Sequence, residues 1–545
     1  MPEIGYRLLE SDKVIIDGRL YLYKRESYWD PVAKKSRQRN STYIGPCDKE
    51  GNLLKPARPR VESVQSSFPV GALSIFYAAA QDLKIRENIE RTLDVSRPVA
   101  SLVLSLALNQ VVGRQPVSHL ADWTLRSPLK NWENLDPENV HRESYLESLS
   151  ALCHPIGGGI DNPGLELQHV LNNVWRQGSR EPAAVYYDVT KQPYYGIDCP
   201  FAALGHDSTG GLSTVVGFGL VTSRDNHHPV LCRPILGSKN DTLGVRDTVN
   251  HLKDFGFEHL MMVLDRGMVS EENIRTVTSA GYDQLGIVRG WNKESWDYVT
   301  QWPQEKLEQP RFVVERSSGE VAYCRAWTAS LFGRAKMRVA VVESSRRACQ
   351  EREARDLALK QLMQGNLSPE RLRQIRAVLN DVVEASPGRH GFHVNEKAMA
   401  EADKGLGRFL MFSTDLSMDA EEMFHLYFQR DAIEKVFETM KGELSLGPIR
   451  YRRADRLEAY ATVVYVAYLL WSWAERKLKE KLTTMRTLRK KYTSLSLTRA
   501  LDIVEGVSWV RFGTGKSIRD WTTRLTEEQE EILKSLGATR YLPVS

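Results

Sequence analysis

The sequence predicts an α/β protein in which a mixed β-sheet is covered by helices and is preceded by a small β-rich module and a helical region. Three observations support this prediction. Residues 1–60 alternate polar and apolar side chains, residues 70–176 repeat apolar side chains at helical spacing, and residues 183–290 alternate strand-like and helix-like segments. Consecutive strands followed by alternating helices and strands are typical of a mixed sheet with helices on its faces.

The first 60 residues are predicted to form a small basic β-rich module. Arg19–Lys24 reads RLYLYK, an alternation typical of a half-exposed strand, and the run KKSRQR at 34–39 indicates a basic turn. The stretch KPARPR at 55–60 is rich in proline and indicates a linker. Residues 61–176 are predicted to be helical, from the apolar runs that begin at Gly71, Arg97 and Leu165.

The core sheet is predicted to come in two parts. Residues 177–290 form the first, with strands at Ala183–Thr190, Ser213–Thr222, Pro229–Arg233, His259–Asp265 and Gln284–Val288 and helices at Thr242–Phe255 and Ser270–Ser279. Residues 291–405 hold three more strands and two charged helices, which we interpret as an insertion. Residues 406–480 form the second part, a strand at Gly407–Thr414 and a long helical stretch broken near Gly447-Pro448. Residues 481–545 are predicted as a C-terminal helical region.

The net charge of the 545 residues is only +5, but the charges are unevenly distributed. Residues 1–60 hold 13 basic and 8 acidic side chains, and residues 441–500 hold 14 basic and 5 acidic. Basic segments of this kind suit contact with a nucleic-acid backbone, although solvated helix surface has the same composition.

Several classes of protein are disfavoured. The six cysteines include no C-x-x-C pair, which argues against a zinc ribbon or a disulfide framework. The first residues are too polar for a signal peptide. The most apolar run, Ala459–Ala474, has 16 residues and is short for a bilayer span, so it is predicted to be a buried helix. We therefore expect a protein of a reducing cytoplasm with no membrane partner.

Two aspartates follow very apolar strand-like runs. Asp188 ends AAVYYD, and Asp265 ends LMMVLD. Active sites of open α/β sheets lie at the carboxyl ends of the strands, so neighbouring strands would bring both carboxylates to one edge. Taken singly, an aspartate after a strand also suits a turn or a helix N-cap.

A third acidic residue lies on a predicted helix with a distinctive face. Tyr427, Arg430, Glu434 and Lys441 fall within an arc of about 60° and span about 21 Å of a single α-helix. Apolar residues form the adjacent stripe and would pack on the sheet; they are Ile433, Val436, Phe437, Met440 and Leu444.

Three carboxylates from separate elements suit a site for two Mg²⁺ or Mn²⁺ ions, because these hard ions prefer carboxylate and water oxygens. Two ions roughly 4 Å apart would activate a water or a 3′-hydroxyl and stabilise the leaving oxygen in an attack on phosphorus. In that arrangement Asp188 would bridge the ions, and Asp265 and Glu434 would each complete one coordination sphere. Arg430 and Lys441 could bind phosphates beside them.

With these residues in this order, the sequence resembles the DDE transposases of the cut-and-paste insertion-sequence branch. The resemblance rests on YYDVT around Asp188, on LDRG at Asp265 with GYD at 281–283, and on the spacing Y-x2-R-x3-E-x6-K from Tyr427 to Lys441, and it covers about 176–290 and 406–475. It implies an RNase H-like fold and metal-dependent cleavage at transposon-end inverted repeats, followed by joining of the 3′ ends to target DNA. It also implies that Tyr427, Arg430 and Lys441 contact DNA near the catalytic acids.

The resemblance further implies double-stranded DNA as partner, a homodimer assembled on that DNA, and a location at the prokaryotic nucleoid. Residues 61–176 would then contribute to DNA binding, although no helix-turn-helix pattern is clear. An aromatic residue of the insertion would hold a flipped base, and Trp291, Trp296, Trp302 and Trp327 are the candidates.

Arginines follow the signature helix directly in the run IRYRR, so we expect Arg450, Arg452 and Arg453 to contact DNA phosphates. Two alternatives stay open. One is a metal-dependent nuclease of the same fold that does not integrate DNA, and the other is a catalytically silent DNA-binding regulator. The complete set of three acids argues against the regulator.

Overall fold

The computed structural model describes residues 12–543 except for 17–18, 51–63, 154–161, 177–182, 207–210, 238–241, 291, 317–318, 366, 380–381, 386–391, 450 and 514–517. The chain divides into two units. Residues 1–67 and 510–521 form the first, and residues 68–509 and 522–544 form the second.

The first unit contains the β-rich module that the alternating pattern predicts. Strands β1 (Asp12–Ile16), β2 (Arg19–Asp30) and β3 (Lys35–Pro46) form an antiparallel sheet in the order β1-β2-β3. The turn between β2 and β3 covers residues 31–34. Most of the run KKSRQR therefore lies on β3, and the prediction that this run forms the turn is wrong except at Lys34.

A second three-stranded sheet has the order β18-β17-β4, from β4 (Val64–Pro69), β17 (Ser508–Phe512) and β18 (Arg519–Thr522). The region predicted as a C-terminal helical region therefore contains two strands as well as helices. Its helices are α18 (Leu488–Lys491), α19 (Leu497–Val504) and α20 (Glu527–Ser535). The strands are short and carry mixed polar and apolar residues, so their sequences give little sign of a sheet.

The helical region after residue 70 follows the predicted period. Its helices are α1 (Gly71–Asp82), α2 (Ile85–Leu93), α3 (Arg97–Leu108), α4 (Val117–Arg126), α5 (Leu129–Trp132), α6 (Arg142–Ala151) and α7 (Pro163–Trp175). Prolines are placed in the first turns of α3 and α7, where no backbone donor is lost. A π-helical turn at Asn109–Gly113 continues α3, and no pattern predicted it.

The core sheet has the strand order of an RNase H-like fold, which confirms the predicted fold class. Its elements are β5 (Ala184–Pro193), β6 (Ala203–His206), β7 (Leu212–Ser223), β8 (Pro229–Leu236), α8 (Thr242–Asp254), β9 (Met261–Leu264), α9 (Glu271–Ser279) and β10 (Asp283–Ile287). β5 lies centrally. On one side β7 pairs antiparallel with β5 and β8 pairs antiparallel with β7, and on the other side β9 and β10 run parallel to β5.

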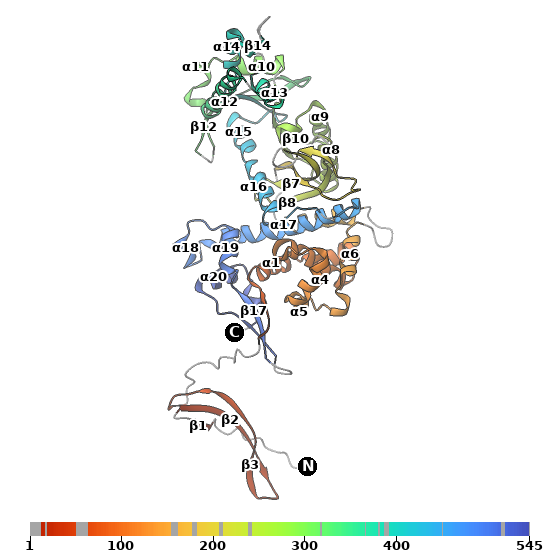
Figure 1. Cartoon of the computed structure of the whole chain (residues 1–545), viewed down its shortest axis with the longest axis vertical. Helices are drawn as coiled ribbons and strands as arrows, with labels where there is room; N and C mark the ends of the chain where they lie inside the picture. Colours follow the sequence, from red (N-terminus) through yellow and green to blue (C-terminus); the bar gives the residue numbers. More distant parts are fainter. Residues whose placement is uncertain are drawn as a thin grey trace. The chain divides into compact units, whose positions relative to one another are not determined.

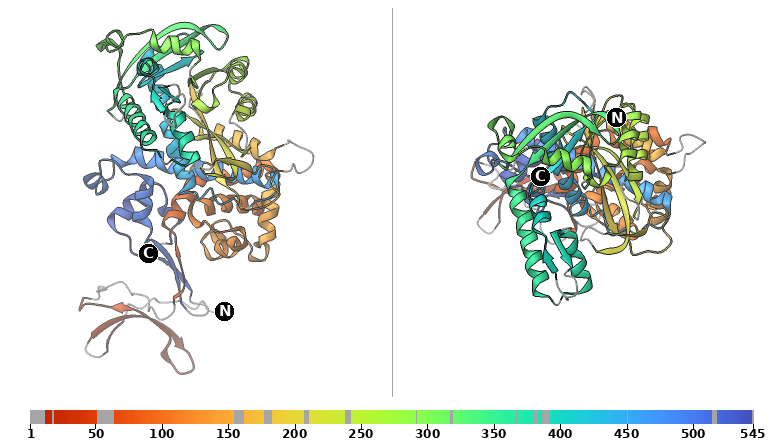
Figure 2. Two further views of the ribbon diagram at one scale, coloured as in Figure 1. Left: turned by 45° about the horizontal axis from the view of Figure 1, so that its top comes forward. Right: turned by 90° about the horizontal axis from the view of Figure 1, so that it is seen from above.

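The strands of the segment 291–405 extend this sheet. β16 (Arg408–Ser413) pairs with β10, and β13 (Arg334–Glu343), β12 (Val321–Leu331) and β11 (Val313–Glu315) follow outward. The other elements are α10 (Lys293–Thr300), α11 (Gln304–Leu307), α12 (Ser345–Gln364), α13 (Pro369–Leu379), β14 (Val383–Ala385), β15 (Phe392–Val394) and α14 (Glu396–Asp403). Figure 2 shows the pair α12 and α13 in green, projecting from the strands.

Three helices follow β16: α15 (Ala420–Phe428), α16 (Asp431–Lys441) and α17 (Ala454–Leu482). α17 packs between β8 and the helices α1, α3, α6 and α7, and Figure 1 shows it crossing the second unit. The apolar run Ala459–Ala474 lies within it and is buried throughout, as predicted. Among the described residues, no helix has the length and apolar character needed to cross a membrane.

Candidate active site

The parallel register of β5 and β9 brings the two aspartates together. Tyr187 of β5 pairs with Leu264 of β9, so Asp188 and Asp265 each come one residue after this pair. β9 ends at Leu264, while β5 continues to Pro193 along β7, so the prediction that Asp188 ends its strand is wrong. Asp188 instead lies on β5 directly after the last residue that pairs with β9. Asp265 precedes a short 3₁₀ turn and makes no side-chain capping bond, so its carboxylate is not used as an N-cap.

The signature residues lie on two helices, and the prediction of a single continuous helix is wrong. α15 ends at Phe428 and α16 begins at Asp431. Across the break the backbone makes i to i−3 bonds: Arg430 N–H donates to the Tyr427 carbonyl at 3.1 Å, and Ile433 N–H donates to the Arg430 carbonyl at 2.8 Å. This tighter 3₁₀ geometry keeps Arg430 in the right-handed helical region while it alters the direction of the side chains.

Arg430 joins the three predicted catalytic acids. Its Nη1 lies 3.5 Å from Asp188 Oδ2, and its Nη2 lies 3.2 Å from Asp265 Oδ1 and 3.6 Å from Glu434 Oε1. The acids come from β5, from the end of β9 and from the first turn of α16, where the helix dipole favours a negative charge. The structure therefore brings together all three acids that the sequence predicts, around one guanidinium.

The side chains of this cluster differ in how far they are exposed to solvent. The Arg430 side chain is 12% exposed, that of Asp188 17%, and those of Asp265 and Glu434 are 40% and 60% exposed. Burial lowers the pKa of Arg430, but the neighbouring acids, Asp265 first, outweigh this and raise it above its usual value. The guanidinium is therefore charged, and its buried Nε has no hydrogen-bond partner among the described residues.

The donor set fits a divalent metal in its chemistry, because it consists of carboxylates at the edge of a sheet. The three carboxylates are spaced around the Arg430 guanidinium and not around a single point. In the described part of the chain, no three Asp, Glu, His or Cys side chains are close enough to share one metal ion. Asp188, Asp265 and Glu434 would be the ligands, provided that Arg430 no longer lies between them.

Tyr427 lies beneath this cluster in the fold. Its side chain is buried, its ring faces the Arg430 guanidinium at 5.6 Å, and burial raises its pKa to about 12. The phenol is therefore protonated at neutral pH and is a hydrogen-bond donor.

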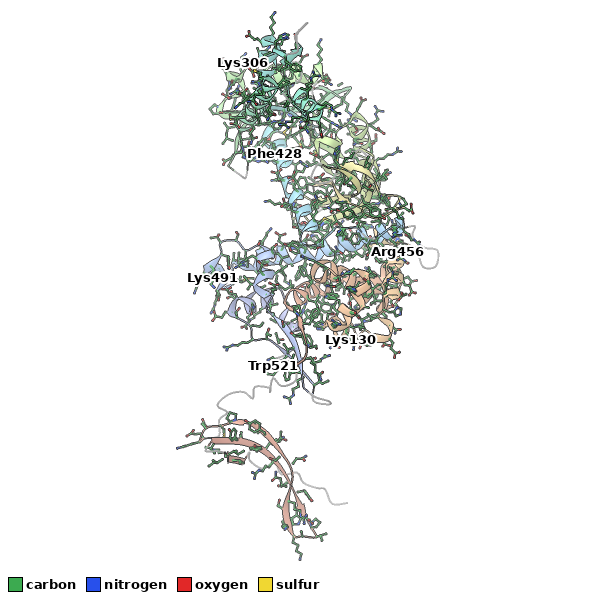
Figure 3. All side chains as sticks on the ribbon, viewed as in Figure 1. Lys130, Lys306, Phe428, Arg456, Lys491 and Trp521 are labelled. Atoms are coloured by element: carbon green, nitrogen blue, oxygen red, sulfur yellow. The ribbon has the colours of Figure 1, made fainter. Side chains whose placement is uncertain are left out.

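The break between α15 and α16 is fixed by residues that the sequence did not single out. Gln429 Oε1 accepts hydrogen bonds from Tyr186 Oη at 3.4 Å and from Arg224 Nε at 3.2 Å. Arg316, between β11 and β12, pairs with Asp431 at 2.6 Å and lies over the ring of Phe428 at 4.1 Å. Figure 3 labels Phe428 at this break. No local pattern marks these contacts, because each joins segments far apart in the chain.

The remaining predicted DNA-binding residues follow Glu434 in the chain. Lys441 ends α16, about 10 Å along the helix axis from Glu434, and within the described residues it makes no ion pair. Arg452 and Arg453 are exposed before α17, and Arg453 pairs with Asp455. Arg450 lies outside the described residues.

The tryptophans predicted to include a base-holding residue have different surroundings. Trp302 has the Arg325 guanidinium 3.4 Å from its ring centroid and meets Trp327 edge to face, and Trp296 donates to Glu401 at 3.2 Å. These three side chains are half-buried. Trp291 lies outside the described residues, so a base-holding role stays a prediction for all four.

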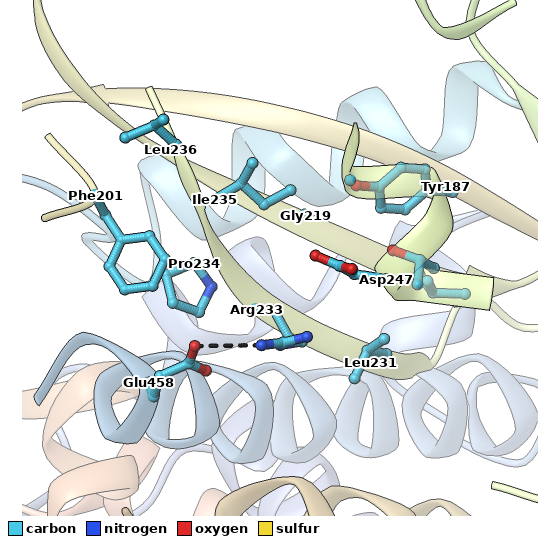
Figure 4. A pocket seen from close by; sticks show the side chains of 13 residues that line it. Tyr187, Phe201, Gly219, Leu231, Arg233, Pro234, Ile235, Leu236, Asp247 and Glu458 are labelled. Atoms are coloured by element: carbon cyan, nitrogen blue, oxygen red, sulfur yellow. Dashed lines mark hydrogen bonds and ion pairs between the residues drawn. The ribbon is translucent and has the colours of Figure 1, made fainter. Parts of the chain in front are cut away.

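A separate cavity lies between β7, β8, α8 and α17. Its volume is about 170 Å³, and Figure 4 shows Arg233 and Asp247 among the side chains around it. Arg233 pairs with Glu458 of α17 at 3.4 Å, and burial is the main cause that raises the pKa of Glu458. None of the three acids around Arg430 lines this cavity. The ion pair anchors α17 to the sheet.

Comparison with known families gives one match. Residues 205–470 match the family described as the transposase DDE domain. Within those bounds the chain is similar to a transposase DDE domain. The match includes Asp265 and Glu434 and begins after Asp188, which enters the site through the register of β5 with β9.

Other comparisons add less. No curated protein matches the chain. Among solved structures, the chain is similar to a piggyBac transposase described as a cryo-EM structure of a synaptic complex with hairpin DNA, with 10% sequence identity, a TM-score of 0.34, and coverage of 80% of this chain and 84% of that one.

Proposed function

We propose that the protein is a DNA transposase that cuts at transposon-end inverted repeats and joins the 3′ ends to target DNA. The observation that carries the proposal is the convergence of Asp188, Asp265 and Glu434 on Arg430 at the edge of an RNase H-like sheet. The match of residues 205–470 to the transposase DDE domain supports it. The piggyBac structure contains DNA, which agrees with double-stranded DNA as the partner.

In this proposal the three acids hold the divalent ions, Mg²⁺ or Mn²⁺, on which such domains depend, with two ions per site. Bound ions would activate a water or a 3′-hydroxyl and stabilise the leaving oxygen. Asp188 is the least exposed of the three acids and lies on the central strand β5. Glu434 is the most exposed and lies nearest to the solvent from which DNA approaches.

Arg430 has two positions in this proposal. Without metal it neutralises the three carboxylates, and with metal it turns to a DNA phosphate beside the site. A planar guanidinium suits both roles because it pairs with carboxylates and with phosphates in the same geometry. Lys441, Arg452 and Arg453 would bind phosphates farther along the DNA, and two copies of the chain would assemble on paired ends.

The proposal is tested with a duplex that carries the element's own inverted repeats, incubated with Mg²⁺ and resolved on a denaturing gel. Asp188→Asn, Asp265→Asn and Glu434→Gln should each abolish cutting while DNA affinity is kept. Glu438→Gln is the matched control, because Glu438 is exposed on the same helix one turn later. Normal cutting by all three variants would show that these acids are not the catalytic ones.

The same gel distinguishes the transposase from the two alternative functions. Released ends that are never joined to a target duplex would favour a nuclease of this fold that does not integrate DNA. DNA binding without any cutting by the unmodified chain would favour a silent regulator. The complete set of acids around Arg430 favours catalysis.

A further inference from the structure

The module of β1–β3 ends in a two-stranded arm. β1 pairs with Arg19–Tyr23 of β2, so in the described part of the chain the rest of β2 pairs with β3 alone. We define the arm as residues 24–42; Lys24 pairs with Thr42 and Asp30 pairs with Lys35. Its seven paired positions on β2 extend about 23 Å. An irregularity between Glu26 and Ser27 bends the ribbon, which Figure 1 shows as curved.

The tip of the arm exposes large apolar side chains. Tyr28 is 44% exposed, Trp29 63% and Val32 93%. Pro31 and Ala33 are also exposed in the turn. An exposed apolar cluster on an otherwise polar ribbon marks a contact surface, because isolated hairpins gain little stability from such residues.

The turn that carries these side chains is held in one conformation. Asp30 Oδ1 accepts the backbone N–H groups of Val32 and Ala33, each at 3.0 Å, and Asp30 pairs with Arg37 across the hairpin at 2.9 Å. The apolar tip is therefore preorganised, and binding it would lose little conformational entropy. The pair also neutralises the carboxylate nearest the tip.

The charge of the arm identifies the class of partner. Residues 24–42 hold six basic and two acidic side chains, against a net charge of +5 for all 545 residues. Lys24, Lys34, Lys35 and Arg37 are exposed along the ribbon. A second copy of the arm would repel this one, whereas a polyanion would be attracted. The major groove of DNA is wide enough for a two-stranded ribbon, and apolar side chains, proline included, can contact base steps in a groove.

We propose that the arm enters a groove of duplex DNA, with its lysines and Arg37 on the phosphates and the tip residues Trp29 and Val32 against the bases. The proposal rests on the proposed function only in taking DNA as the partner. It gives the first unit a role that is independent of the three acids.

The test measures binding of the full chain to a fluorescein-labelled duplex of mixed sequence, by anisotropy at several salt concentrations in EDTA, so that no cutting occurs. Lys34→Gln with Lys35→Gln should weaken binding and reduce the slope of log K against log salt by about 1.8, two phosphate contacts at about 0.9 each. The control is Lys253→Gln with Lys534→Gln, which removes the same charge from exposed positions on α8 and α20. An equal loss in both pairs would overturn the proposal.

A second pair of variants tests the tip. Trp29→Ser with Val32→Ser should weaken binding by about tenfold to a hundredfold, as loss of contact with bases does, and should leave the salt slope unchanged. Because both side chains are exposed, thermal unfolding should stay as in the unmodified chain. Unchanged DNA affinity would overturn the proposal. If these variants also lost self-association in sedimentation, the tip would be assigned to contact with a second copy of the chain.

The outcomes also separate this inference from the proposed function. Asp188→Asn should bind the duplex normally in EDTA, whatever its effect on cutting. If the unmodified chain binds no duplex, both proposals fail. If it binds and the arm variants bind equally well, only the arm proposal fails.

Discussion

Replacement of Arg430 by glutamine is predicted to tighten the binding of divalent metal. The guanidinium lies among the three carboxylates that would ligate the ions, so metal and arginine compete for the same oxygens. Removing the positive charge leaves the acids mutually repulsive. The vacated site should therefore accept a divalent cation more readily.

The magnitude follows from the three contacts. At 3.5 Å and an effective dielectric of about 20, the pair of Arg430 with Asp188 has a gross attraction of about 5 kcal/mol. Desolvation of these two mostly buried groups offsets most of that. The pairs with Asp265 and Glu434 are screened by solvent and add roughly 0.2–1 kcal/mol each. A net of about 1.5–3 kcal/mol to displace the guanidinium corresponds to about tenfold to a hundredfold in metal affinity.

The assay is isothermal titration of the DNA-free protein with Mn²⁺, with thermal unfolding measured in parallel. Arg430→Gln should bind Mn²⁺ more tightly, unfold at a lower temperature in EDTA, and regain stability when Mn²⁺ is added. Lys435→Gln is the matched control, because Lys435 is exposed on α16 and its replacement removes the same charge. Arg430→Lys keeps the charge and should stay close to the unmodified affinity.

Two results would refute this reasoning. Mn²⁺ binding by Arg430→Gln no tighter than that by Lys435→Gln would show that the guanidinium does not compete for the carboxylate oxygens. Alternatively, Asp188→Asn could leave Mn²⁺ binding unchanged in the Arg430→Gln background, which would place the metal elsewhere. Neither result depends on DNA cutting, so the test stands apart from activity.

Three further predictions concern residues around the site and in the core. Lys441→Gln should reduce affinity for the inverted-repeat duplex about threefold to tenfold at low salt, as loss of one phosphate contact does, without lowering the unfolding temperature. Tyr427→Phe should slow cutting on the gel about tenfold through loss of one buried hydrogen-bond donor, while Mn²⁺ affinity is kept. Because the pKa of Tyr427 is about 12, the pH–rate profile of the unmodified chain should show no step from this phenol below pH 10. Burial lowers the pKa of His228 to about 3, so unfolded chains bind an extra proton below pH 6.5 and stability is lost as the pH falls. The loss should be about 2 kcal/mol between pH 7 and pH 5 in urea titrations, and His228→Asn should flatten that dependence.

Much of the fold could be predicted from local pattern. The apolar runs before Asp188 and Asp265 and the helical periods of α1, α3 and α7 lie where the sequence indicates, because burial on both faces demands continuous apolar residues. The pairing of β10 with β16, and of β16 with β13, could not be predicted. Registers between strands more than 50 residues apart depend on the whole sheet, so 291–405 reads as an interruption although its strands extend the sheet.

In the candidate site, too, some features could be predicted from the sequence and others could not. Side-chain type and order were sufficient to select Asp188, Asp265 and Glu434, since few positions place acids after such apolar strands. The central position of Arg430 was not predicted, because it depends on a break in a sequence with neither glycine nor proline. AEEMFHLYFQRDAIEKVFETMK is a continuous amphipathic pattern, and only the contacts of Gln429 and Asp431 with distant residues reveal why it divides.

The break between the helices also explains why Tyr427 and Arg430 form a pair. In a 3₁₀ turn, side chains at i and i+3 eclipse one another, whereas in an α-helix they are offset by about 60°. The hydrogen bond from Arg430 N–H to the Tyr427 carbonyl is of the 3₁₀ type, and the guanidinium lies over the tyrosine ring. From there its nitrogens reach acids on β5, after β9 and on α16. A straight helix would direct Arg430 differently from Tyr427, so the break, more than the spacing of the signature, accounts for a cation within reach of all three acids.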